Sequence, residues 1–150
     1  MKYSELKGVK DFCEGLDSTP DWRECVSHIQ QGSADFTIDG VRFINSFDID
    51  EIQQSELSGD EYIIGCFNSS VLAGVLGVPS STIDALQKVE AFEAIGQLVL
   101  AKEDGIEELQ KEYARLDGYG HHFNHYDFSE EELSPYATND MHFHVFDNRS

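Results

Sequence analysis

Histidines are the residues whose side chains could most directly do chemistry in this chain. His121, His122 and His125 lie within five residues, and His142 and His144 alternate along a later β-prone segment, so they share one face. Imidazole is the commonest metal ligand, and such a group could hold zinc or iron. The spacing contains no HExxH and fits no defined metal motif. We therefore expect no cofactor. If a metal is bound, the candidate ligands are the first three histidines. The alternative is a tail whose histidines bond to the backbone and pack among aromatic rings.

Carboxylates are the most numerous reactive groups. The chain has 29 Asp and Glu against 10 Lys and Arg, a formal net charge of −19. Affinity for phosphate rests on Lys and Arg, so we expect no direct nucleic-acid binding. A rigid array of carboxylates can instead imitate the phosphates of a duplex and enter a basic cleft, with fast, salt-sensitive binding. The alternative is a solvated surface with no partner.

Two acidic segments, 48–61 and 103–117, are the expected partner-binding surface, and a third acidic group runs from Asp127 to Asp147. The expected partner is a basic protein. The candidate residues in the first two segments are Asp48, Asp50, Glu51, Glu56, Asp60, Glu61, Glu103, Asp104, Glu107, Glu108 and Glu112.

A helix-turn-helix pattern gives an alternative function, that of a regulatory DNA- or protein-binding protein. Ala73-x3-Gly77-x5-Ile83 has the small residue, the turn glycine and the apolar anchor of that motif. A recognition helix should present several Arg, Lys, Asn or Gln side chains to the bases. Here it would offer only Gln87 and Lys88, so two packed core helices are the simpler interpretation.

The chain carries none of the common nucleophile or phosphate-loop motifs. GxSxG, GxGxxG and a Gly-rich phosphate loop are missing from the sequence. Its three cysteines include no CxxC pair and favour a reducing compartment. Cys66 lies in an apolar run and is expected to be buried, while Cys13 and Cys25 could act in catalysis only beside a histidine. We expect no enzymatic activity and no catalytic residues. A metal-dependent enzyme at the histidine cluster is the remaining alternative.

The sequence pattern predicts an α+β fold in a single domain, residues 1–150, whose helices and strands would position these side chains. The stretch from Tyr62 to Leu100 holds only three acids and one base, and its apolar spacing predicts a buried helical core with a long helix at about 82–102. Asp39-Gly40 between β-prone runs predicts a hairpin, and alternation over 141–146 predicts a C-terminal strand that joins it in a small antiparallel sheet. The other predicted elements are helices near 2–15, 21–32, 48–57, 60–67, 71–76 and 106–116, an ordered loop at 118–128, and an acidic turn or helix start at 129–132.

Membrane insertion and export are not expected. No run of about 18 apolar residues is present, and the first residues lack the apolar region of a secretory signal. The expected location is the cytoplasm, and a homodimer is compatible with the long apolar helix.

Two stretches resemble a known group of proteins. They are Tyr62-Ile-Ile-Gly-Cys-Phe-Asn68 leading to the segment 85–96, and Asp117-Gly-Tyr-Gly-His-His-Phe-Asn-His-Tyr-Asp127. Together they resemble small uncharacterised acidic proteins of bacteriophages and prophages, in which a YGHHF-type run and an aromatic strand close the chain. The resemblance covers the C-terminal part and implies no catalytic residues. It implies a phage context, in which small acidic proteins often inhibit host defence as anti-restriction or anti-CRISPR DNA mimics. The expected function is thus a non-enzymatic inhibitor in the host cell, binding a CRISPR or restriction subunit.

Overall fold

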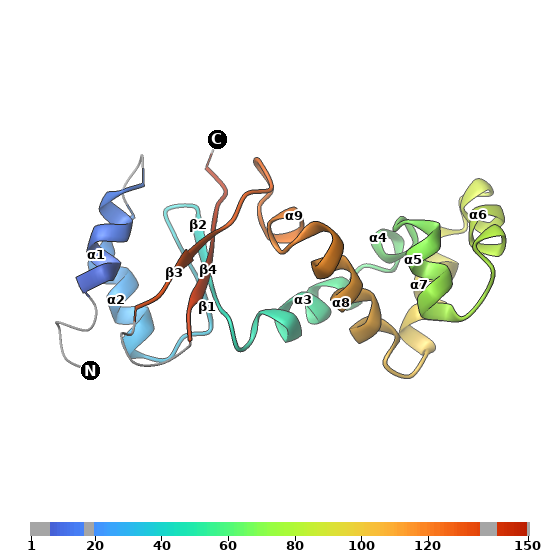
Figure 1. Ribbon diagram of the computed structural model, residues 1–150, viewed down its shortest axis with the longest axis horizontal. Coiled ribbons are helices and arrows are strands. Elements are labelled where there is room, and N and C mark those ends of the chain that lie inside the picture. Colours follow the sequence, from blue (N-terminus) through green and yellow to red (C-terminus); the bar gives the residue numbers. More distant parts are fainter. Residues whose placement is uncertain (1–6, 17–19, 136–140, 150) are drawn as a thin grey trace. The chain divides into compact units, whose positions relative to one another are not determined.

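The chain divides into two compact units in the computed structural model, which describes residues 7–16, 20–135 and 141–149 (Figure 1). The sheet unit comprises residues 1–49 and 119–150, and the helical unit comprises residues 50–118. The predicted α+β class is confirmed, because helices predominate and the strands form one small antiparallel sheet. The single-domain prediction for 1–150 stays a prediction, since the compactness of each unit does not report whether the two unfold together.

The sheet unit is built on four antiparallel strands in the order β1-β2-β4-β3. Their bounds are β1 (Asp35–Ile38), β2 (Val41–Asn45), β3 (Glu131–Leu133) and β4 (Phe143–Asp147). The predicted hairpin is confirmed: Asp39 and Gly40 have φ of 50° and 85°, as a two-residue turn with positive φ at both positions requires. The predicted C-terminal strand is also confirmed and pairs with β2. The acidic segment 129–132 was predicted wrongly, because part of it forms the edge strand β3 on β4.

The two faces of the sheet carry different elements. Helices α1 (Lys7–Glu14) and α2 (Trp22–Gln30) share a buried core with Phe36, Phe43 and Phe143. Side chains alternate along a strand, so Phe146 points to the opposite face, where it packs against Phe123 of the short helix α9 (Gly120–Phe123) with ring centroids 5.2 Å apart. The remainder of the predicted first helix, residues 2–6, lies outside the described residues.

The helical unit contains six helices among its residues, all of which are described. They are α3 (Ile49–Ser58), whose first residue belongs to the sheet unit, α4 (Glu61–Gly65), α5 (Ser69–Leu76), α6 (Ser80–Lys88), α7 (Phe92–Ala101) and α8 (Gly105–Asp117). The helix predicted at 60–67 corresponds to α4, and Asp60 caps it by accepting a hydrogen bond from the backbone N–H of Ile63 at 3.1 Å. Within the described part of the chain, no helix is both long enough and apolar enough to cross a membrane.

The single long helix predicted at about 82–102 is wrong, because the chain turns between α6 and α7. Glu90 adopts a left-handed conformation with φ of 61°, and the N–H of Ala91 donates to the carbonyl of Leu86 at 2.9 Å. These features close the end of α6 in the way a helix C-terminus commonly does. Val89 is exposed at this turn, so the apolar spacing that continues through it does not mark a continuous buried stripe.

Close packing of α7 on α4 accounts for the turn. A Cβ at Gly65 would lie 1.9 Å from the carbonyl oxygen of Phe92, and a Cβ at Gly96 would lie 2.1 Å from that of Glu61. The two backbones therefore touch at two glycines, an approach that a larger side chain would prevent. This contact buries Ile64 and Ile95. It fixes the start of α7 beside α4.

Candidate functional site

A buried glutamine joins the helices that carry the two predicted acidic segments. Gln110 of α8 is fully buried, and its Nε2 donates to Asp50 Oδ1 at 2.8 Å and to Gln53 Oε1 at 2.9 Å, both on α3. Its Oε1 accepts from Gln54 Nε2 at 2.9 Å. Buried amides require such partners, so this network holds α3 beside α8. The structure thereby brings the two acidic segments of the helical unit together.

The predicted partner-binding carboxylates differ in exposure. Six are exposed, namely Glu51, Glu56, Asp60, Glu103, Asp104 and Glu108, and five are half-buried, namely Asp48, Asp50, Glu61, Glu107 and Glu112. Some already have a structural role: Asp60 caps α4, and Glu61 accepts from Gln97 Nε2 at 3.1 Å. Asp48 precedes α3 and belongs to the sheet unit.

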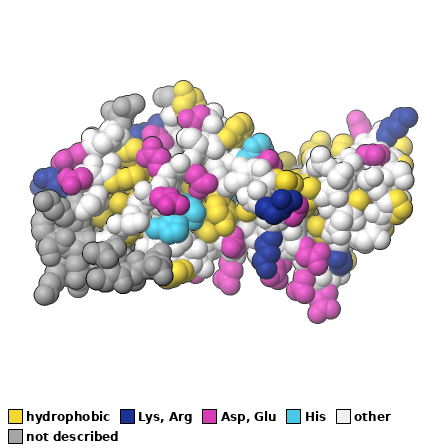
Figure 2. Space-filling model, in the orientation of Figure 1, with side chains coloured by type: hydrophobic (Ala, Val, Ile, Leu, Met, Phe, Trp, Pro, Cys, Tyr) yellow, Lys and Arg dark blue, Asp and Glu magenta, His cyan; other side chains and the backbone are white. Residues whose placement is uncertain are grey.

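Three ion pairs that involve carboxylates of α8 neutralise part of the negative charge of the helical unit. Glu107 pairs with Lys111 at 2.7 Å, Glu108 pairs with Lys102 at 3.1 Å, and Glu112 pairs with Arg115. The hydrogen bond from the Arg115 guanidinium lowers the pKa of the Glu112 carboxyl. Figure 2 likewise shows basic side chains among the acidic ones on the visible face. The helical unit still has fourteen acids against four bases, so a strong negative excess remains.

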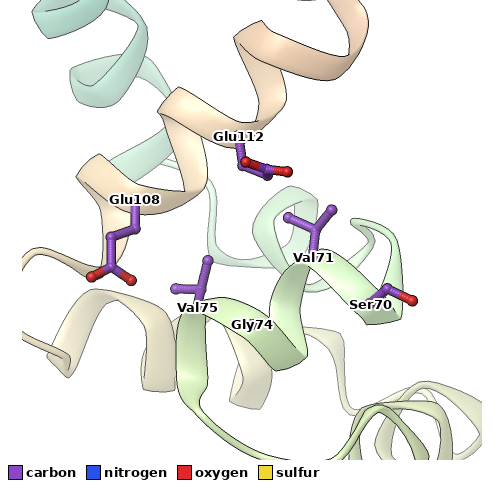
Figure 3. Close-up of a pocket in the computed structure, with 6 residues that line it drawn as sticks. All are labelled: Ser70, Val71, Gly74, Val75, Glu108 and Glu112. Carbon is purple, nitrogen blue, oxygen red and sulfur yellow. The ribbon is translucent and has the colours of Figure 1, made fainter.

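Part of this negative charge lines a groove between α5 and α8. A pocket of about 240 Å³ lies here. Figure 3 shows Glu108 and Glu112 of α8 on one side of it, with Val71, Gly74 and Val75 of α5 on the other. A neighbouring pocket shares Ser70, Val71 and Glu112 and extends the lining to Asn68, Leu116 and Asp117. A Cβ added at Gly74 would meet no atom within 4 Å, so the groove is open at this point. Sequence reasoning did not find the groove, because nothing in the sequence sets α5 against α8.

The arrangement suits a basic side chain chemically. Val71 and Val75 can cover the aliphatic stem of a lysine or arginine. The carboxylates of Glu108 and Glu112 can accept hydrogen bonds from its charged head. Of their present partners, Lys102 also donates to the backbone carbonyl of Val75 on α5, whereas Arg115 lies on an exposed side chain that an incoming cation could replace.

The helix-turn-helix pattern has the expected local geometry. Ala73 and Ile83 are buried, and Gly77 is left-handed with φ of 69°, between α5 and α6. Gln87, however, donates from Nε2 to the backbone carbonyls of Gly65 at 3.0 Å and Phe67 at 2.8 Å. One of the two side chains predicted to read bases is therefore engaged inside the helical unit.

Cys13 and Cys25 lie together in the core of the sheet unit. Both are free thiols and fully buried. The hydrogen bond between them, followed by burial, raises the pKa of Cys25, and the same hydrogen bond lowers the pKa of Cys13. Burial keeps both thiols away from solvent. The predicted burial of Cys66 is wrong, because it follows the last turn of α4, beyond the buried Ile64 and Gly65, and is exposed.

The three histidines that would be the candidate ligands of a bound metal have other neighbours. The ring of His121 stacks on Phe128 with centroids 4.7 Å apart, and that of His122 meets Phe123 edge to face at 4.6 Å. His125 is exposed. Within the described residues these histidines form no metal-binding group.

A different trio does come together. Glu132, His142 and His144 each present one ligand atom, and these atoms lie within 4.8 Å of one another. The sequence predicts that the two histidines share a face. It does not predict that Glu132 joins them, because an acidic turn or helix start is expected at 129–132 and the structure forms a strand there.

The comparisons with known proteins add no assignment to this geometry. No protein-family model, no curated protein and no solved structure matched the chain. The resemblance to acidic phage proteins therefore stays a prediction, and any function is argued from the residues.

Proposed function

We propose that the helical unit binds a basic segment of a partner protein in the groove between α5 and α8. The protein would then act as a non-enzymatic inhibitor of a nucleic-acid-handling defence protein of the host, such as a CRISPR or restriction subunit. The observation that supports this is the groove itself, where Glu108 and Glu112 face small and apolar side chains of α5. The exposed carboxylates, Glu51 and Glu103 among them, would attract the basic partner and orient its approach.

The mechanism we propose is competition for a cleft that normally holds nucleic acid. A cleft lined by Lys and Arg binds phosphates largely through charge, and a fixed set of carboxylates can take their place. Binding should weaken as salt rises, since both partners' charges are screened. It requires no catalytic group and no cofactor.

The test is a pull-down from bacterial lysate, followed by competition with duplex DNA for the purified captured protein. The groove variant Glu108→Gln/Glu112→Gln/Asp117→Asn should lose binding. Its matched control, Asp11→Asn/Glu14→Gln/Glu24→Gln, removes the same charge from exposed positions of the sheet unit and should retain it. Equal losses in both variants would show that net charge, not the groove, determines binding, and would contradict the proposal.

A second candidate is a regulator built on α5 and α6, because their turn has helix-turn-helix geometry. It predicts direct DNA binding at physiological salt through the exposed face of α6, including Lys88. Substitution of Lys88 by Glu should abolish such binding, whereas it should leave binding in the groove unchanged.

A further inference from the structure

The edge of the sheet places two histidines and a carboxylate on one face. In the β3–β4 register Glu132 lies directly opposite His144, and His142 precedes His144 by two residues. Side chains two apart on a strand, and those directly opposite on neighbouring antiparallel strands, share a face. The rings of His142 and His144 have centroids 4.8 Å apart, and His142 Nε2 lies 3.7 Å from Glu132 Oε1.

A second carboxylate orients the more buried histidine. Glu130 Oε2 lies 3.0 Å from His144 Nδ1. An ionised carboxylate only accepts, so Nδ1 carries the proton and donates it to this bond. In the neutral ring the lone pair is then on Nε2, the form in which histidine binds a metal. In metal-bound histidines the ring N–H that does not face the metal commonly donates to such a carboxylate, which fixes the ring orientation and raises the basicity of the other nitrogen.

We propose that Glu132, His142 and His144 bind a zinc ion on the β3–β4 edge of the sheet unit. Two imidazoles and one carboxylate form a ligand set that zinc accepts, with a fourth position open to water or an incoming ligand. Tetrahedral zinc at about 2.0–2.1 Å from each ligand needs ligand atoms roughly 3.4 Å apart. In the structure the three ligand atoms lie within 4.8 Å of one another, so modest rotation of the side chains would bring them to that separation. The Glu132 side chain is 66% exposed and therefore has room to rotate.

The exposure of the ligands fits a site reached from solvent. The side chain of His144 is 10% exposed and that of His142 is 28% exposed, so one ligand is fixed and two face outward. Figure 2 shows histidine side chains next to acidic ones on the visible surface. Because β3 is a three-residue edge strand, a metal that links it to β4 would also hold that edge in place.

Zinc binding to the full chain without a histidine tag tests the proposal, by calorimetric titration and by the visible spectrum of the cobalt-substituted protein. The wild type should bind a single zinc ion per chain, and His142→Asn should weaken zinc binding at least about 100-fold. Glu132→Gln and Glu130→Gln should each weaken it about 10- to 100-fold. The affinity should fall as the solution is acidified, because protons compete with the metal for the imidazole nitrogens.

The matched control replaces histidines outside the trio. His121→Asn/His125→Asn should bind zinc as the wild type does, with a tetrahedral cobalt spectrum. Far-ultraviolet circular dichroism checks each fold, and the exposed position of Glu132 keeps one variant informative if a histidine variant misfolds. Lack of zinc binding by the wild type in excess zinc, or unchanged affinity in a folded His142→Asn or Glu132→Gln variant, would overturn the proposal.

Discussion

The sheet unit and the helical unit have nearly the same acidic excess but differ in the chemistry that accompanies it. The helical unit has fourteen acids against four bases and no histidine, whereas the sheet unit has fifteen acids, six bases and all six histidines. Histidine is the side chain whose ordinary pKa lies closest to neutrality. The sheet unit therefore holds all the side chains that we propose as zinc ligands, and the negative charge of the helical unit comes from carboxylates alone.

This difference separates the two proposals experimentally. Binding in the groove depends on carboxylates and should respond to salt more than to neutral pH. Binding at Glu132, His142 and His144 should respond to pH, because protonated imidazole cannot coordinate. A substitution in one unit that changes the behaviour of the other would report how far the two units are coupled.

The largest effect is expected where α4 and α7 touch. Gly96→Ala should lower the free energy of unfolding by about 3 kcal/mol or more, since its Cβ would lie 2.1 Å from the backbone oxygen of Glu61. Gly74→Ala is the matched control, because its Cβ would meet nothing within 4 Å on the exposed face of α5. It should stabilise the helix by about 0.5–1 kcal/mol. Urea unfolding measures both.

The same variant tests the single-domain prediction. If the units unfold together, Gly96→Ala will shift hydrogen exchange in β2 and β4 as well as in α7. If exchange slows or quickens only within residues 50–118, the prediction of one domain over 1–150 is wrong. Wild-type stability in Gly96→Ala would contradict the close contact of the two helices.

The second largest loss of stability is expected at Gln110, the buried glutamine that joins α3 and α8. Gln110→Leu should cost about 1–3 kcal/mol, because the fully buried Gln53 loses the donor to its Oε1 and Asp50 loses one hydrogen bond. Gln97→Leu makes the same change at an exposed position of α7 and should alter stability by at most about 0.5 kcal/mol. Thermal unfolding compares the two; similar losses would argue against a structural network around Gln110.

The sequence predicted those elements whose cause is local. Asp39-Gly40 supplies a turn by its own backbone preferences. Alternation over 141–146 predicts the last strand, although β4 is buried on both faces. The turn at Glu90 has no such local cause, since neither glycine nor proline stands there and apolar spacing continues through Val89. It arises from the packing of α7 against α4, which a sequence pattern does not reveal.

The candidate sites likewise differ between what local sequence predicts and what depends on tertiary packing. His121, His122 and His125 are close in sequence, but in the structure the rings of His121 and His122 pack against Phe128 and Phe123. Glu132 reaches His144 only through strand pairing, and a strand of three residues with two glutamates has little β propensity. The α5–α8 groove likewise depends on tertiary contact, although its carboxylates belong to the segment 103–117 that the sequence singled out.

The third effect concerns the groove and is smaller. Gly74→Leu should fill the groove and weaken binding of a fluorescent oligo-arginine peptide about tenfold, equivalent to about 1.4 kcal/mol. Ala85→Leu adds a similar side chain at an exposed position of α6, away from the groove, and should bind normally. Fluorescence anisotropy at low salt gives both affinities, and equal affinities would show that the peptide does not enter the groove.

The smallest effect compares one surface ion pair from each unit. Asp147 accepts from the Arg149 guanidinium at 2.8 Å and 2.7 Å and from its backbone N–H at 3.1 Å, and these hydrogen bonds lower the pKa of the Asp147 carboxyl. A carboxyl whose folded pKa is depressed stabilises the fold above its unfolded pKa, and this contribution is lost as pH falls through the folded value. The Asp147 side chain is 38% exposed, so solvent screening limits the loss in Asp147→Asn to a few tenths of a kcal/mol at about pH 7.

That loss should diminish as pH falls below the ordinary aspartate pKa of about 3.9, and it should disappear below the depressed folded pKa of Asp147, where the wild-type carboxyl is neutral as well. Glu112→Gln removes the corresponding partner of Arg115 in the helical unit, where the carboxylate lies on the helix surface and accepts no backbone hydrogen bond from its arginine. Its effect should be smaller still, because the Arg115 pair lacks the third hydrogen bond that Arg149 gives to Asp147. Urea unfolding across the acidic range measures both variants. A loss in Asp147→Asn that persists unchanged at low pH would show that lost packing, and not the ion pair, destabilises that variant.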